Sequence, residues 1–325
     1  MNNKVLEINE LEVVYRTDDA VVKAVNGISF NMSSRETLAL VGETGAGKTT
    51  TALSIMRLLP ERTGIIKQGK IILDGENILD KKESEMRKIR GSKISMIFQD
   101  PMTSLNPLMT VGDQILEVLS IHNYDSLSKH ELNIKVEELL GLVGIPTVRR
   151  FDYPHQFSGG MKQRIVIAIA LACNPEVLIA DEPTTALDVT IQAQVMKLIE
   201  DLKAKFNTSI LLITHDLGIV AEISDKVAIM YAGQIIEFGT VREVFEEGKH
   251  HPYTEGLFDS IPDLNGKSKR LKPIPGLMPD STNLPSGCKF HPRCSKALEI
   301  CSTEEPACYI FGSHSISCHL FNTNR

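Results

Sequence analysis

Residues 42–49 read Gly-Glu-Thr-Gly-Ala-Gly-Lys-Thr and fit the pattern Gly-x4-Gly-Lys-Ser/Thr of a phosphate-binding loop. Glycines let such a loop curl so that its backbone N–H groups face a phosphate, and a helix that starts at the loop adds its positive end. The Lys48 ammonium would reach the β- and γ-phosphates of a nucleotide, and the Thr49 hydroxyl would bind Mg²⁺. The loop residues predicted to bind nucleotide are Gly42, Thr44, Gly45, Ala46, Gly47, Lys48, Thr49 and Thr50.

A second candidate group is the apolar run 177–180, which ends in two carboxylates, Asp181 and Glu182. In a parallel sheet, such a strand end lies at the carboxyl edge where ligands bind. Asp181 is suited to hold Mg²⁺ through its water shell, and Glu182 is suited to polarise an attacking water. A solvated strand end is the alternative, but the phosphate loop makes nucleotide hydrolysis the better interpretation.

The elements that must position these groups alternate between strand and helix. Residues 4–41 alternate in a β-like manner and end in the apolar run 37–41, which suits a buried strand. A helix is expected from Thr49 to Leu59, ended by Pro60. Further strands are predicted at 94–98, 177–180 and 210–213, and further helices at 134–142 and about 190–206. This alternation predicts parallel βαβ units and an α/β sheet.

The composition is that of a globular protein, because 42% of the 325 residues are hydrophobic and 23% are charged. The net charge of −6 gives no reason to expect a nucleic-acid partner. No apolar run approaches the roughly 20 residues that span a bilayer, and residues 1–15 lack the apolar core of a secretory signal. We therefore expect a soluble, cytoplasmic protein that reaches a membrane only through a partner.

The segment 157–164, Phe-Ser-Gly-Gly-Met-Lys-Gln-Arg, resembles the signature sequence of ABC-type ATPases. Its place after the phosphate loop and before the acidic strand end makes the resemblance specific. Met161 departs from the commonest family sequence, which has Gln there. Four further landmarks resemble the family's adenine-stacking aromatic, Q-loop, D-loop and switch histidine, and they are Tyr15, Gln99, Ala186-Leu187-Asp188 and His215.

The resemblance implies a P-loop (RecA-like) α/β nucleotide-binding domain over residues 1–245. It would contain an antiparallel β subdomain and a helical signature subdomain at about 101–165. In that family two such domains meet head to tail, so Ser158, Gly159 and Gly160 would grip the γ-phosphate that the partner holds. The roles implied for single residues are catalysis for Glu182, His215 and Gln99, Mg²⁺ binding for Thr49, Gln99 and Asp181, and nucleotide contact for Tyr15 and Asp188.

Cysteines are crowded near the end of the sequence, where Cys288, Cys294, Cys301 and Cys318 offer four thiolates. Four sulfurs suit tetrahedral zinc or an iron–sulfur cluster equally well, and the spacing does not separate the two. A disordered tail with free thiols is the third possibility. Three histidines lie among these cysteines, namely His291, His314 and His319.

Residues 246–325, an irregular cysteine-rich extension, resemble the C-terminal region of dipeptide/oligopeptide (and nickel) importer ATPases. The resemblance rests on His251-Pro-Tyr-Thr, on Pro275-Gly276 followed by Pro279, and on 287–294. Some members carry a 4Fe-4S cluster, which implies Cys288, Cys294, Cys301 and Cys318 as its ligands and leaves Cys308 over. Zinc remains the alternative.

The resemblance also implies partners and a location. These are transmembrane permease subunits, a second and non-identical ABC ATPase subunit, and, indirectly, a substrate-binding protein, at the inner face of the cell membrane. The cargo stays open between dipeptide, oligopeptide and nickel. Two rival interpretations are an ABC-type ATPase that acts on nucleic acid or the ribosome, and an ATPase whose cysteine tail is a redox sensor.

Overall fold

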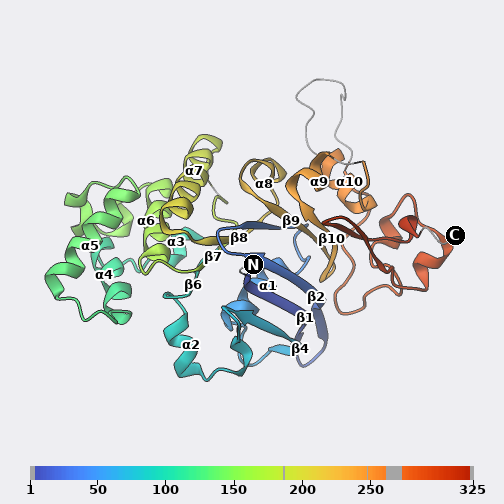
Figure 1. Cartoon of the computed structure of the whole chain (residues 1–325), viewed down its shortest axis with the longest axis horizontal. Coiled ribbons are helices and arrows are strands. Elements are labelled where there is room, and N and C mark those ends of the chain that lie inside the picture. Colours follow the sequence, from blue (N-terminus) through green and yellow to red (C-terminus); the bar gives the residue numbers. More distant parts are fainter. Residues whose placement is uncertain (1–3, 186, 247, 261–272, 323–325) are drawn as a thin grey trace. The chain divides into compact units, whose positions relative to one another are not determined.

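The computed structural model describes residues 4–185, 187–246, 248–260 and 273–322 (Figure 1). The chain divides into two compact units. Unit 1 contains Met1–Leu6, Asn31–Thr37 and Ile72–Ile213, and unit 2 contains Glu7–Phe30, Leu38–Ile71 and Thr214–Arg325.

Unit 1 is built on three parallel strands, β6 (Ile94–Ile97), β7 (Val177–Asp181) and β8 (Ser209–Thr214), with β7 in the middle. Every residue of the three strands is buried. Strands covered on both faces are continuous apolar runs, which is why the sequence predicts them to within about a residue. The carboxyl end of β7 carries Asp181, at the sheet edge expected for a ligand site.

The helices of unit 1 are α2 (Glu83–Ile89), α3 (Pro101–Ser104), α4 (Val111–Ile121), α5 (Lys129–Leu142), α6 (Gly159–Leu171) and α7 (Val189–Phe206), with 3-10 turns η1 (Ile78–Asp80), η2 (Thr147–Phe151) and η3 (Pro154–Gln156). Helix α5 begins before the predicted start at 134 because Ser128 and Glu131 form a capping box. Thr110 caps α4 by accepting from the Asp113 N–H.

Unit 2 contains a sheet in the order β3-β9-β10-β12-β11. Its strands are β3 (Thr37–Val41), β9 (Lys226–Tyr231), β10 (Gln234–Thr240), β11 (Cys308–Phe311) and β12 (His314–Ser317). Only β3 and β9 pair in parallel, whereas the other neighbours are antiparallel. The hairpin β11–β12 extends the sheet beyond β10, so the C-terminal extension, expected to be irregular, also contributes two strands.

A second sheet has the order β2-β1-β4-β5, with β1 (Lys4–Arg16), β2 (Val21–Ser33), β4 (Gly64–Leu73) and β5 (Glu76–Asn77). Most residues of its three long strands belong to unit 2. Helix α1 (Lys48–Met56) ends three residues earlier than predicted, because Arg57 adopts a left-handed conformation with φ of 51°.

The remaining helices of unit 2 are α8 (Leu217–Ile223), α9 (Val241–Glu246) and α10 (Pro252–Asp259), with 3-10 turns η4 (His291–Arg293), η5 (Glu299–Ser302) and η6 (His319–Phe321). The extension folds onto the sheet through three buried aromatic rings, Tyr231 of β9, Tyr253 of α10 and Phe290. Their ring centroids lie 4.7 to 5.4 Å apart in edge-on arrangements. The extension therefore shares the apolar core of the sheet.

Within the described ranges, no helix combines the length and the apolar character that crossing a bilayer requires.

Candidate functional site

The phosphate loop lies between β3 and α1 in unit 2, as predicted. Its curvature requires glycine, since a Cβ atom on Gly42 would lie 2.2 Å from the Met230 carbonyl oxygen. Gly47 has φ of +103°, and a Cβ atom there would lie 2.4 Å from the Ala24 carbonyl oxygen. The loop is therefore pressed against β2 and β9, and no larger side chain fits at either position.

The ammonium of Lys48 lies inside this loop. Its Nζ donates to the carbonyl oxygens of Gly42 at 2.6 Å and Glu43 at 3.1 Å, and the side chain is buried. Thr44, Gly45 and Thr49 are exposed, while Ala46 is buried. Tyr15 reaches the same segment, because its hydroxyl lies 3.2 Å from the Thr50 hydroxyl.

One loop residue is held by the C-terminal extension. The Glu43 N–H donates to the Tyr253 hydroxyl at 2.9 Å. The Glu43 carboxylate pairs with both terminal nitrogens of Arg293, at 2.7 and 3.1 Å. Neither Tyr253 nor Arg293 was predicted to be a site residue, although both belong to the motifs that carried the family resemblance.

In unit 1 the structure brings Gln99 and Glu182 together. The Gln99 amide Nε2 donates to Glu182 Oε2 at 2.9 Å, and the Thr185 hydroxyl donates to the same oxygen at 3.0 Å. Glu182 has φ of +47°, and its N–H donates to the Ile213 carbonyl at 2.8 Å. Asp181, the preceding residue, is only 1% exposed. Thr185 is a contact that the sequence analysis did not predict.

The signature segment opens α6, with Ser158 at the N-cap position and Gly159 as the first helical residue. A Cβ atom on Gly160 would lie 2.6 Å from Ile191 Cγ2, so glycine allows α6 to approach α7 closely. Gln163 of α6 donates to the Pro183 carbonyl at 2.5 Å, which ties the signature helix to the residue after Glu182. Asp188 caps α7 by accepting from the Ile191 N–H at 3.0 Å, and Ala186 lies outside the described residues.

His215 is exposed, belongs to unit 2 and comes directly after β8 in the sequence. The next residue, Asp216, caps α8 by accepting from the N–H groups of Gly218 and Ile219 at 2.9 and 3.2 Å. The predicted site residues thus fall into two sets. Unit 2 holds Tyr15, residues 42–50 and His215, and unit 1 holds Gln99, residues 158–160, Asp181, Glu182 and Asp188.

The four predicted ligand cysteines gather in unit 2. The pKa of Cys318 is raised to about 12, mainly by burial and to a smaller extent by the neighbouring thiols of Cys288, Cys294 and Cys301. Burial likewise raises the pKa values of Cys288 and Cys294. Cys308 is exposed on β11.

The backbone supports this gathering. The Cys288 N–H donates to the Cys301 carbonyl at 2.9 Å, and a Cβ atom on Gly287 would lie 2.4 Å from that carbonyl oxygen. The three interspersed histidines have other partners: His291 bonds the Cys288 carbonyl, His319 bonds the Glu304 carbonyl, and His314 bonds Glu237. These contacts leave the four thiols as the shared donor set.

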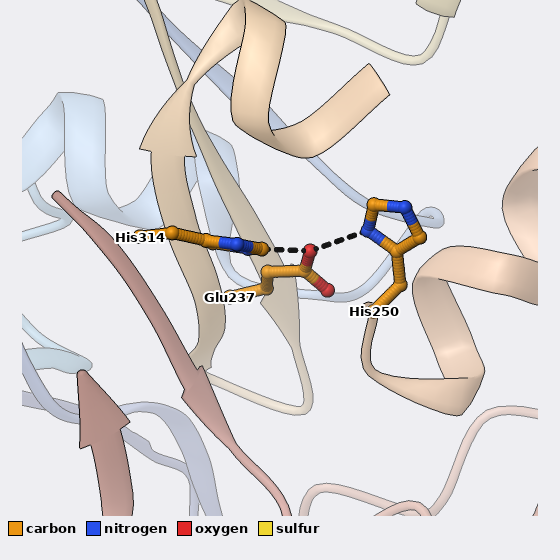
Figure 2. A group of neighbouring side chains, drawn as sticks. All are labelled: Glu237, His250 and His314. Atoms are coloured by element: carbon orange, nitrogen blue, oxygen red, sulfur yellow. Dashed lines mark hydrogen bonds and ion pairs between the residues drawn. The ribbon is translucent and has the colours of Figure 1, made fainter. Parts of the chain in front are cut away.

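A second polar cluster, Glu237, His250 and His314, lies at the join between β10, the segment before α10, and β12 (Figure 2). Glu237 Oε1 contacts His250 Nδ1 at 3.0 Å and His314 Nε2 at 2.9 Å. Glu237 Oε2 accepts from the His251 N–H at 2.8 Å and the Thr254 hydroxyl at 2.6 Å.

Burial alone would raise the pKa of Glu237, but these four hydrogen bonds outweigh it and lower the pKa to about 2. One carboxylate and two imidazoles are donors that zinc accepts. Through its four hydrogen bonds, the Glu237 carboxylate joins β10 to α10, to the segment before α10 and to β12.

Comparison with known proteins shows the family to which this chain belongs. Residues 25–185 match the model described as ABC transporter, and residues 236–301 match the model of the oligopeptide/dipeptide transporter C-terminal region. The chain is 50% identical to the oligopeptide transport ATP-binding protein AppD of Bacillus subtilis, over 97% of this chain and 96% of AppD. It is 48% identical to the dipeptide transport ATP-binding protein DppD of the same organism, over 98% and 95% of the two chains.

Among solved structures, the dimeric ATP-binding cassette MJ0796, in a post-hydrolysis state bound to ADP and Pi, superposes with a TM-score of 0.65. The identity is 25%, over 73% of this chain and 99% of that cassette. The ABC ATPase fold predicted from the motifs is thereby confirmed. With relatives about half identical along nearly its full length, this chain belongs to the ABC transporter ATP-binding proteins of the oligopeptide/dipeptide type.

Proposed function

We propose that this protein is the ATP-hydrolysing subunit of an importer that takes up dipeptides or oligopeptides through a separate permease. The observation that carries the proposal is the near-half identity to oligopeptide and dipeptide transport ATP-binding proteins over almost the whole length of both chains. The match of residues 236–301 to the oligopeptide/dipeptide C-terminal region supports it independently of the ATPase motifs.

The residue roles that we propose are those implied by the motifs. The phosphate loop with Lys48 would hold the β- and γ-phosphates, and Tyr15 would stack on the adenine. Thr49, Asp181 and Gln99 would hold the Mg²⁺ ion of the nucleotide. Glu182, whose carboxylate is oriented by Gln99 and Thr185, would accept a proton from the attacking water, and His215 would contact the γ-phosphate.

A second cassette would complete the site through its signature residues. Ser158, Gly159 and Gly160 open a helix of 13 residues, whose first N–H groups and positive end suit a phosphate. In the proposed arrangement they would contact the nucleotide held by the partner cassette, and Asp188 would lie at the junction. We propose that the partner is a different ATPase subunit.

The permease would dock beside Gln99, on the segment 100–107. Two apolar residues that flank this segment are exposed, Phe98 by 43% and Leu108 by 85%. Apolar side chains left in solvent next to a catalytic loop suit a contact with permease helices. The protein would then lie at the cytoplasmic face of the membrane, held by the permease, with a substrate-binding protein acting from the other side.

Co-purification with the permease, followed by ATPase assays, tests the function. Adding the substrate-binding protein loaded with a peptide should raise ATP turnover, whereas the empty binding protein should raise it less. Stimulation by nickel-loaded binding protein instead of peptide would change the cargo assignment. Co-purification with RNA in place of a permease would favour the non-transport alternative.

We further propose that Cys288, Cys294, Cys301 and Cys318 hold a 4Fe-4S cluster. Thiolates around one zinc ion at about 2.3 Å lie less than 4 Å apart. Among the described residues, no three of these sulfurs all lie within 4.8 Å of one another, which is a wider spacing than one zinc ion requires. The bound cluster would supply the positive iron centres that stabilise four neighbouring thiolates.

Iron and acid-labile sulfide should therefore be present in protein purified without oxygen. A colourless, iron-free preparation would contradict the iron assignment, and stoichiometric zinc would support the alternative. We propose a structural role for the cluster, within an extension that begins near residue 246 and follows the nucleotide-binding domain 1–245.

A further inference from the structure

The phosphate loop and the cysteine-bearing extension are joined by an ion pair whose guanidinium is buried. Glu43 is the second residue of the phosphate loop, and Arg293 lies 250 positions later in the sequence. Arg293 Nη1 lies 2.7 Å from Glu43 Oε2, and Nη2 lies 3.1 Å from Oε1. This fork-to-fork geometry fixes the direction of the carboxylate as well as its position.

Solvent is excluded from the Arg293 side of the pair, whereas Glu43 is partly exposed. The Arg293 side chain is 5% exposed and that of Glu43 is 32% exposed. The guanidinium is itself held, because Nε donates to the Pro275 carbonyl at 2.9 Å. It also lies near the rings of Tyr231 and Phe290, so its orientation is set by packing.

Glu43 has a second contact from the extension, since its backbone N–H donates to the Tyr253 hydroxyl. The carbonyl of the same residue accepts from Lys48, the lysine expected to bind phosphate. Side chain, N–H and carbonyl of Glu43 are thus all engaged, and the partners of its side chain and its N–H come from the extension. A shift of Arg293 would be passed directly to the backbone that positions Lys48.

Arg293 is also the residue before Cys294. It lies in the turn η4. In and just after this turn, the N–H groups of His291, Arg293 and Cys294 donate to the carbonyls of Cys288, Phe290 and His291, respectively. The position of the guanidinium therefore depends on the same turn that places two of the four gathered cysteines.

We propose that Arg293 is a positioning residue for nucleotide binding, through which the cysteine-bearing turn sets the affinity of the phosphate loop for ATP. The inference rests on the proposed binding of ATP at this loop. It assigns to the extension an effect on the nucleotide site in addition to its own folding.

The test is equilibrium titration of the full chain with a fluorescent ATP analogue, together with steady-state ATPase kinetics. Arg293→Gln should weaken binding roughly tenfold and raise KM for ATP while kcat changes little, because the pair acts on ground-state binding. Arg293→Lys should recover only part of the affinity, because an ammonium cannot form the fork.

The matched control is Lys296→Gln. Lys296 lies three positions further along the same turn region and pairs with Glu255, away from the phosphate loop. This variant should change the affinity by less than about twofold, as expected of an exposed pair. Thermal unfolding of each variant shows whether Arg293→Gln is folded.

A double-mutant cycle keeps the proposal testable if one variant is unstable. Glu43→Gln combined with Arg293→Gln should bind no worse than Arg293→Gln alone, because the second change removes the uncompensated carboxylate. Independent, additive losses would overturn the proposal, as would Arg293→Gln with wild-type affinity. Lys48→Ala distinguishes failure of the Arg293 proposal from failure of the proposed ATP site. Unchanged nucleotide binding in Lys48→Ala would refute the assignment of the phosphate loop itself.

Discussion

The Gln99 amide donates to Glu182 at 2.9 Å and so joins a residue two positions after β6 to the residue after β7. The two strands are parallel neighbours, which places their carboxyl ends side by side. Thr185 contributes a second hydrogen bond to the same carboxylate oxygen. One oxygen of Glu182 is therefore oriented, and the first two predictions concern this arrangement.

Glu182→Gln should bind ATP with near-normal affinity but hydrolyse it about a hundredfold or more slowly, because the amide cannot accept the proton of the attacking water. Nucleotide binding and ATP turnover measured on the same preparation test this. Thr185→Ala is the matched control, and it should lower turnover only a few-fold. Near-normal turnover in Glu182→Gln would show that another group is the base.

Gln99→Glu should affect the pH profile of hydrolysis. The substitution would place a second carboxylate at hydrogen-bond distance from Glu182, and two such groups resist ionising together. The pH at which kcat reaches half its maximum should therefore rise relative to the wild type. Gln99→Ala should lower kcat without that rise, and identical profiles for all three proteins would contradict the predicted coupling.

The Glu237 cluster predicts an acid-sensitive extension. Glu237 has a folded pKa of about 2 against an ordinary value of 4.5, so the unfolded chain binds the proton more readily. Its contribution to stability, of order 3 kcal/mol, is fully present above pH 4.5 and is lost as the pH falls toward 2. Glu237→Gln should lower the free energy of unfolding at neutral pH and flatten its pH dependence in that window.

Burial lowers the pKa of His251 to about 4 from an ordinary 6.5, so stability is also lost as the pH falls from 6.5 toward 4. His251→Asn keeps a side-chain acceptor for the Tyr253 N–H and should remove that part of the pH dependence. Denaturant unfolding at several pH values measures both effects. The exposed Glu246→Gln is the control, and a pH dependence equal to wild type in Glu237→Gln and His251→Asn would contradict the assignments.

Two cysteine variants distinguish a proposed cluster ligand, Cys318, from Cys308, which is not a proposed ligand. If the four thiols hold the proposed 4Fe-4S cluster, Cys318→Ser should lose most of the iron, because Cys318 is buried among the other three thiols. Cys308→Ser should keep it, because Cys308 is exposed on β11. Iron and sulfide content per chain are the measurements, and equal iron content in the two variants would exclude Cys318 as a ligand.

Local patterns were enough for part of this structure. The strands β6, β7 and β8 are continuous apolar runs, and the phosphate loop and acidic strand end are short motifs. Each of these features can therefore be predicted from a short stretch of sequence. The pairing of β12 with β10 is different, because Ile316 and Glu237 are far apart in the chain and neither segment specifies the other.

The same limit applies to the site. Gln99 and Glu182 were both predicted, but their hydrogen bond depends on which strands are neighbours. Arg293 was visible only as part of a family motif, because no local periodicity indicates that a guanidinium will meet a residue 250 positions earlier. Helix α1 ends early because Arg57 takes a left-handed conformation, which a pattern of apolar residues does not encode.

The wide separation of Glu43 and Arg293 has a consequence for biosynthesis. At about 5 to 20 residues per second, the ribosome adds Arg293 roughly 10 to 50 seconds after Glu43. During that interval the nascent phosphate loop lacks the guanidinium that orients it. A translation product that stops before residue 293 would carry an intact nucleotide motif whose second residue has lost its cationic partner.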